Sequence, residues 1–284
     1  MALPKLQAPQ DWLSQLWNIM LGERVDLEQD AWLLGPIGDI GGIADRFIER
    51  LARDESLSIV RNEPSSGLID GFSDFPTVAG RVHAKIEDFY QHTADYEFDV
   101  WSAWRGAFAL GGNLIYRTYS KRVQQLNLPQ RSLDTAEGVS SEIIQLIDNG
   151  GQVAYTVWYR KLNSTGEVVY SGVYSRCHIP SGENCLKIVF PLPQGSATVI
   201  MRLSVDEDGN LLLTSAGKRT GDPGFYFLVE DSKGQMWKHY LPSFQEKIFV
   251  FVDQAGETRA EHTMQLRGRR VCELRYRMRR LSGF

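Results

Sequence analysis

The stretch QVAYTVWYRKLNSTGEVVYSGVYSRCHI, residues 152–179, decides the fold of this chain. Apolar and polar side chains alternate on both sides of LNSTG, which contains the Asn and Gly that a tight turn needs. β-Branched and aromatic residues are enriched in both runs, which favours strands over helices. The stretch therefore predicts two antiparallel β-strands joined as a hairpin.

The same pattern of short alternating runs and turns extends from residue 141 to residue 278. Turns such as DNGG (148–151), DEDGN (206–210) and DQAGE (253–257) separate about ten strands in this region. These connections are too short for parallel crossovers, so the sheet is expected to be antiparallel and mostly a meander. Because twist accumulates over many strands and open edges are unfavourable, we expect the sheet to curl into a barrel or half-barrel.

Helical periodicity dominates the N-terminal part of the chain. Apolar residues recur on one face over residues 11–21, 41–55 and 77–93, and a fourth helix is predicted over residues 112–129, ended by Pro129. These elements precede the alternating runs and do not interleave with them, which is typical of an α+β fold.

We therefore expect an α+β protein that is lipocalin-like in general shape. A helical N-terminal section, residues 1–92, would pack on a strongly curled antiparallel β-meander, a barrel or half-barrel formed by residues 93–284. The two sections are expected to fold as one cooperative unit. Cys177 and Cys185, which flank HIPSGEN, are expected to face each other across a hairpin as reduced, packed thiols.

Composition excludes several classes of protein. The chain has 284 residues, of which 43% are hydrophobic and 23% charged, with a net charge of −4, as is usual for a globular protein. No apolar run approaches the roughly 20 residues needed for a membrane span. The N-terminus lacks the apolar core of a signal peptide, so a cytoplasmic location is expected. The Arg-rich end RRVCELRYRM (269–278) alternates with apolar residues, which indicates a charge-protected strand and not a nucleic-acid interface.

Cofactor and metal motifs are missing from the sequence. The five His and three Cys lack metal-ligand spacing, so no metal is expected. GPIGDIGG (35–42) lacks both phosphate-loop spacings, and no G-x-S-x-G is present for a serine nucleophile. We therefore expect no cofactor and assign no catalytic residue, and whether the chain is an enzyme stays open.

One face of several predicted strands mixes large aromatic rings with basic groups. Aromatic walls that carry a few polar groups are typical of pockets for organic ligands. The alternative is that these rings cover the sheet against the N-terminal helices, with their polar tips in water. The residues of this kind are Trp158, Tyr170, Tyr174, Arg176, His178 and Tyr226.

The segment YEFDVWSAWRGAF (96–108) combines carboxylates, rings and an arginine. As a strand it places Glu97 and Asp99 on one side, where we favour a solvent-exposed acidic face over a cation or acid–base site. Trp101, Trp104 and Arg105 come next, and a guanidinium beside indoles can hold a carboxylate or stack on an aromatic ligand. The alternative, which we favour, pairs Arg105 with a carboxylate of the same segment.

The predicted function is capture of a small, mainly apolar organic molecule in the concavity of the sheet. Arg105, Arg176 or His178 would orient its polar end. Two alternatives stay open: a cofactor-independent cyclase, isomerase or hydratase acting in the same place, and a non-catalytic interaction protein with a filled core. The partner expected is the small molecule, with no oligomeric state assigned. The candidate ligand-binding residues are Trp101, Trp104, Arg105, Trp158, Tyr170, Tyr174, Arg176, His178 and Tyr226.

A set of motifs distributed along the chain resembles an uncharacterised bacterial protein family of unknown function. The resemblance covers most of the chain, implies no activity and transfers no catalytic residue. It implies only that residues 1–284 form one unit. The motifs are WLLGPIGDIGGIADRFI (32–48), IEDFYQHTADYEFDVWSAW (86–104), QQLNLP (124–129), DTAEGVSSE (134–142) and GDPGFYF (221–227).

Overall fold

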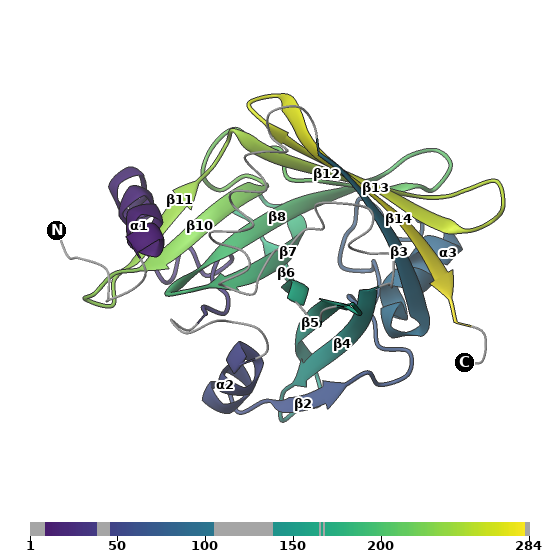
Figure 1. Cartoon of the computed structure of the whole chain (residues 1–284), viewed down its shortest axis with the longest axis horizontal. Coiled ribbons are helices and arrows are strands. Elements are labelled where there is room, and N and C mark those ends of the chain that lie inside the picture. The colour runs from purple at the N-terminus through teal and green to yellow at the C-terminus, as the bar shows by residue number, and fades with distance from the viewer. Residues whose placement is uncertain (1–8, 39–45, 105–138, 165, 167, 282–284) are drawn as a thin grey trace.

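The computed structural model describes residues 9–38, 46–104, 139–164, 166 and 168–281, and β-strands dominate it (Figure 1). Fourteen strands form one sheet whose ladders are antiparallel. The helices are α1 (Pro9–Leu21), α2 (Arg46–Asp54), α3 (Ala84–Gln91) and the 3-10 helix η1 (Thr93–Asp95). The strands are β1 (Glu23–Arg24), β2 (Ser58–Arg61), β3 (Tyr96–Trp104), β4 (Val139–Ile147), β5 (Val153–Leu162), β6 (Val168–His178), β7 (Asn184–Leu192), β8 (Gly195–Val205), β9 (Leu211–Thr214), β10 (Gly224–Glu230), β11 (Met236–Tyr240), β12 (Phe244–Val252), β13 (Thr258–Leu266) and β14 (Arg269–Arg280).

Strands β4 to β8 form the predicted antiparallel meander, each paired with the next along the chain. The turn between β4 and β5 illustrates how the sequence favours such hairpins. Asp148 accepts the N–H groups of Gly150 and Gln152 at 2.8 and 2.9 Å, and Gly151 has a φ of 79°, which favours glycine. In the hairpin of β6 and β7, the buried free thiols of Cys177 and Cys185 stand opposite each other as predicted.

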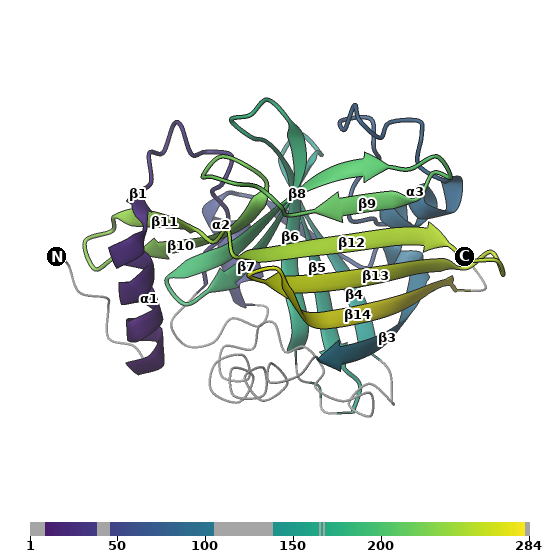
Figure 2. The ribbon, with the colours of Figure 1, turned by 90° about the horizontal axis from the view of Figure 1, so that it is seen from above.

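The sheet branches at β8. Gly195–Ile200 of β8 pairs with β10, whereas Arg202–Val205 on the same edge pairs with β9. One branch then continues through β10 and β11 to β1, and the other through β9, β12, β13 and β14 to β3. Figure 2 shows β12–β14 and β3 passing in front of β4–β6, so the second branch faces the meander.

The prediction of a strongly curled barrel or half-barrel, lipocalin-like in shape, is wrong. In the described residues the sheet is open: β2 pairs only with β4, β3 only with β14 and β1 only with β11, so three end strands remain unjoined. The meander that closure requires is interrupted after β9, because β10 returns to β8 and does not continue from β9. Because the sheet branches, the strand twist accumulates along two shorter arms instead of along one long meander. Neither arm then has enough consecutive strands for twist to favour closure into a barrel.

The predicted α+β class is also wrong, because antiparallel strands make up most of the described structure. The three helices expected in residues 1–92 occur in its described residues only as the short α1, α2 and α3. Helix α1 matches the helix predicted over residues 11–21. The one predicted over residues 77–93 begins only at Ala84, since Gly80 has a φ of 68° that a helix does not accept. His83 caps α3 by accepting the N–H of Lys85 at 3.2 Å. The helix predicted over residues 112–129 lies outside the described residues.

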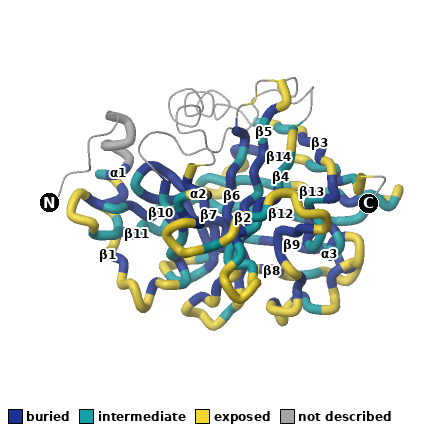
Figure 3. The backbone as a smooth tube through the Cα atoms, turned by 90° about the horizontal axis from the view of Figure 1, so that it is seen from below, coloured by how far each residue is buried: buried dark blue, intermediate teal, exposed yellow. Residues whose placement is uncertain are grey.

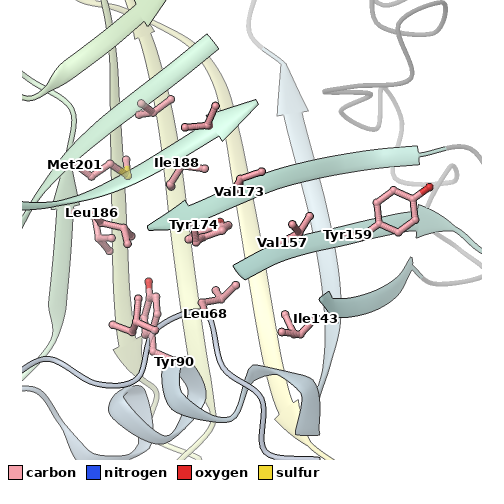
Figure 4. Packing of buried hydrophobic residues seen from close by; sticks show 14 of the residues in the cluster. Leu68, Tyr90, Ile143, Val157, Tyr159, Val173, Tyr174, Leu186, Ile188 and Met201 are labelled. Carbon is pink, nitrogen blue, oxygen red and sulfur yellow. The ribbon is translucent and has the colours of Figure 1, made fainter. Parts of the chain in front are cut away.

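The hydrophobic core lies where the strands of the meander meet the segments around α2 and α3. Strands β6 to β8 are mostly buried, and the exposed residues gather in the connecting loops (Figure 3). Figure 4 shows Leu186 and Ile188 of β7 beside Tyr174 of β6, with Tyr90 of α3 approaching the same cluster. In the part of the chain that the structure describes, no helix has the length and apolarity that a membrane span requires.

Candidate ligand-binding cavity

The described residues enclose a cavity of about 250 Å³ between the meander and the facing branch of the sheet. Its walls come from α3, from β3, from β5 to β10 and from β12 to β14, so strands far apart in the strand order contribute to one space. Most lining side chains are apolar or aromatic. The polar and ring-bearing ones that matter for chemistry are Phe98, Trp158, Arg160, Tyr170, Tyr174, Glu246, His262 and Tyr276.

Strand alternation brings the aromatic side chains of β5 and β6 to the face of the sheet that lines the cavity. Trp158 and Arg160 are two residues apart on β5 and so share a face, and the register sets them opposite Gly172 and Tyr170 of β6. Gly172 is required here, because a Cβ at this position would lie 2.8 Å from the ring of Tyr170. The missing side chain lets the Tyr170 ring lie across β6, with its centroid 5.7 Å from that of Trp158.

The rings form a continuous wall across the gap between the two arms. The centroid of Phe98, on β3, lies 5.1 Å from that of Trp158, on β5. Tyr170 continues the wall to Phe190, with centroids 5.1 Å apart and planes nearly perpendicular. Tyr170 meets Trp158 and Phe190 edge to face, and Phe98 is tilted against Trp158. Offset and edge-to-face ring pairs are favourable, so the rings form an apolar wall before any ligand binds.

Two tyrosine hydroxyls meet in this wall. The hydroxyl oxygens of Tyr170 and Tyr174 lie 2.6 Å apart, within hydrogen-bonding distance. Burial raises the pKa of both groups far above the usual tyrosine value. They therefore stay protonated at neutral pH and serve as hydrogen-bond donors and acceptors, not as bases.

Arg160 is the cation of the cavity, and only 5% of it is exposed. Its guanidinium carbon lies 5.0 Å from the ring centroid of Trp158 and 5.2 Å from that of Phe98. The ring of Tyr276, on β14, lies at 5.9 Å. These cation–π contacts favour the charge, whereas burial lowers the pKa of Arg160. A guanidinium remains protonated in proteins, so the cavity keeps a positive charge.

A carboxylate and an imidazole form the second polar feature. Glu246 of β12 and His262 of β13 both line the cavity, with each side chain 12% exposed. Their Oε2 and Nε2 atoms are 2.8 Å apart. The register pairs His262 with Ile248, so Glu246 reaches it diagonally from two residues away on the neighbouring strand. A carboxylate that holds an imidazole in this way fixes its tautomer and orientation.

Three of the residues predicted from the sequence come together in the cavity: Trp158, Tyr170 and Tyr174. Trp101 points away from it and is 45% exposed, and Trp104 packs against Val271 and Cys272. Arg105, with its predicted carboxylate partner, lies outside the described residues.

The other three predicted residues lie away from the cavity lining. Arg176 is paired with Asp74 on the outer surface, and His178 contacts the side chain of Asn184 at 2.8 Å. Tyr226 is fully buried in a separate cluster, where its hydroxyl donates to the carbonyl of Asp222 at 2.5 Å. These polar groups are satisfied by a loop (Asp74), by the first residue of β7 (Asn184) and by a turn (Asp222).

The acidic residues of β3 face outward, on the side opposite the cavity. Arg279 of β14 pairs with Glu97 at 2.9 Å and with Asp99 at 3.2 Å. The carboxylates are therefore matched by the strand next to them in the sheet. Their place on the outer face of a strand agrees with the favoured interpretation of this segment.

Sequence reasoning missed the polar residues that line the cavity. A signal existed for Arg160, which alternation places on the face of Trp158 in the same run. Glu246 and His262 are 16 residues apart, and no motif joins them. Only the pairing of β12 with β13 brings them into contact.

In the described residues, this geometry defines an antiparallel β-sheet protein with an aromatic cavity lined by the cation Arg160 and by the pair of Glu246 and His262. Comparison with protein-family models, with curated proteins and with solved structures gives no match to the chain. The function must therefore be argued from the cavity.

Proposed function

We propose that this protein binds a small, mainly apolar organic molecule in the cavity. The observation that carries the proposal is the cavity itself: a space lined mainly by apolar and aromatic side chains, with few polar groups directed into it. Ligand sites have this composition, because apolar area supplies affinity and a few polar groups fix orientation. The aromatic wall is already formed, so ligand binding requires little reorganisation of side chains, which favours affinity.

The volume limits the size of the guest. A dry cavity of about 150 Å³ holds one benzene molecule, so by proportion about 250 Å³ holds roughly ten non-hydrogen atoms. That is slightly less than the roughly 300 Å³ at which drug-sized pockets begin. The expected ligands are therefore bicyclic aromatics or short alkyl chains. An interaction protein with a filled core would have no reason to keep this space.

Naphthalene matches the expected size and tests the proposal. We expect one molecule to bind per chain in isothermal titration calorimetry. Ala260, on β13, is buried and lines the cavity, so Ala260→Phe fills part of the space and should weaken binding by about tenfold or more, as overpacking costs about 1–3 kcal/mol.

The matched control is Ala103→Phe, the same change at an exposed position on β3 that does not line the cavity. It should leave the affinity unchanged. Absence of binding by naphthalene and by other apolar probes of similar size, or equal loss of affinity in both variants, would contradict the proposal.

The pair of Glu246 and His262 favours a second candidate function, an isomerase or hydratase acting in the same cavity. An imidazole oriented by a carboxylate can move a proton to or from a bound molecule, and exclusion of water supports such chemistry without a cofactor. The probe is 2-indanone in deuterated water, because proton removal next to its carbonyl appears as deuterium uptake in the NMR spectrum. We expect uptake about 100-fold faster than in buffer alone.

Loss of this exchange in Glu246→Gln, with naphthalene binding retained, would support catalysis by the pair. The matched control is Glu261→Gln, which removes an exposed carboxylate from β13 next to His262. If the exchange rate equals that in buffer, or if both variants exchange as fast as the parent chain, this second function is excluded and ligand binding alone remains.

A further inference from the structure

We propose that the molecule bound in the cavity carries a carboxylate, and that Arg160 holds it. The inference rests on the proposed function and names the chemical class of the ligand: a small aromatic or aliphatic carboxylic acid in its ionised form. It follows from the position of one buried charge and from what surrounds that charge.

Among the described residues, Arg160 has no carboxylate as the counter-ion that a buried cation needs. Its Nε atom is buried without a hydrogen-bond partner among the described residues. The groups there that act on its charge are the tyrosines 170, 174 and 276, and Tyr276 also forms a side-chain hydrogen bond with it. A buried charge is costly unless it is paired. The three rings around the guanidinium supply only part of what removal from water costs.

The carboxylate that shares the cavity does not fill this role. Glu246 is engaged by His262 at 2.8 Å, and no ion pair within the described residues joins it to Arg160. Two more accessible arginines of the same sheet have carboxylate partners: half-buried Arg259 pairs with Asp253 at 2.8 Å, and exposed Arg202 pairs with Glu183. Arg160 is thus a buried arginine in a cavity, and none of the described carboxylates forms an ion pair with it, in contrast to Arg259 and Arg202.

The surroundings of Arg160 suit a planar anion. A guanidinium presents its donors in a fork that matches the two oxygens of a carboxylate. The hydroxyls of Tyr170 and Tyr174, kept protonated by burial, lie in the same wall and can donate to the same anion. A ligand with an apolar body packed against the rings and a carboxylate bound to Arg160 would contact all the groups described above. Glu246 and His262 are the exceptions.

Three pairs of probes that differ only in charge test the inference: benzoate with benzamide, cinnamate with cinnamamide, and octanoate with octanamide. We expect the parent chain to bind the carboxylate more tightly than its amide, by about 10- to 100-fold, in at least one pair. In Arg160→Met the carboxylate should lose this advantage, while the affinity for the amide changes by less than about threefold.

Thermal melting verifies that the variant is folded, and an apolar replacement for an unpaired buried charge is expected to preserve or raise the melting temperature. Arg160→Lys keeps the charge without the fork and should recover part of the preference. Arg176→Met, which removes an exposed arginine from β6 outside the cavity, should keep all of it.

The outcomes separate this inference from the proposed function. If amides and carboxylates bind equally well in every pair, or if Arg160→Met keeps the preference, the carboxylate inference is wrong and the apolar cavity still binds ligands. If none of the six probes binds and naphthalene does not bind either, both proposals fail.

Discussion

Raising the pH above 10 is expected to unfold this protein cooperatively. Burial raises the pKa of Tyr276 to about 12, and it raises the pKa values of Tyr90, Tyr170 and Tyr174 even further from the usual value of 10. These hydroxyls stay protonated in the folded chain at a pH at which they ionise in the unfolded chain. All four side chains line the cavity, so ionisation would place negative charge inside it.

The sign of the effect follows from proton binding. Because the folded pKa lies above the unfolded pKa, each tyrosine contributes stability that is complete below pH 10 and is lost as the pH rises through the folded value. For Tyr276 the loss amounts to about 3 kcal/mol once the pH exceeds 12. Four such groups acting together can exceed the total stability of a typical domain.

The measurement is a pH titration followed at 295 nm, where tyrosinate absorbs, and by circular dichroism of the sheet. We expect the two signals to change together between pH 10 and about pH 12. Tyr276→Phe removes one of the four groups and should shift the transition to higher pH. Titration of these tyrosines near pH 10 with the sheet signal intact would show that they are not enclosed as described.

Substitution of Asp30 by Asn is expected to destabilise the protein by about 3–5 kcal/mol. Its carboxylate oxygens lie 2.6 and 2.7 Å from Nζ of Lys238, on β11, and the two side chains are 7% and 13% exposed. One of these oxygens also accepts the N–H of Asp26 at 2.9 Å. The amide keeps the shape but removes the charge, so the buried ammonium group of Lys238 loses its counter-ion.

Urea unfolding measures this loss, and the melting temperature should fall by about 10 °C. The control Glu28→Gln makes the same kind of change at an exposed position of the same loop and should alter stability by less than about 0.5 kcal/mol. The double variant Asp30→Leu with Lys238→Met removes both charges and should recover most of the stability. An equal effect of Asp30→Asn and Glu28→Gln would show that the ion pair contributes little.

Local features of the sheet could be predicted because they depend on neighbouring residues. The hairpin of residues 152–179 forms as expected. In the following hairpin, Cys177 of β6 lies opposite Cys185 of β7. Alternation also placed Trp158 and Arg160 on one face of their strand. Turn chemistry and a period of two residues are properties of short segments, and a single sequence displays them directly.

The pairing of distant strands could not be predicted, and this is where the predicted barrel failed. Nothing in residues 96–104 indicates that they pair with the last strand of the chain, yet Phe98 stands opposite Met278. Nothing in residues 224–230 indicates a return to β8. Loop length limits which strands can be neighbours but does not choose among those that are far apart in the chain.

The sequence by itself determined that residues 141–278 form short antiparallel strands and which side chains share a face of each. Tertiary structure alone decided that the sheet stays open and branched, and which faces enclose the cavity. It alone brought Arg160 to Tyr276 and Glu246 to His262. The physical reason is that the alternation of apolar and polar residues depends only on which face of a single strand is buried. A site depends on contacts between strands that are distant in the sequence, and no local pattern specifies which strands pair.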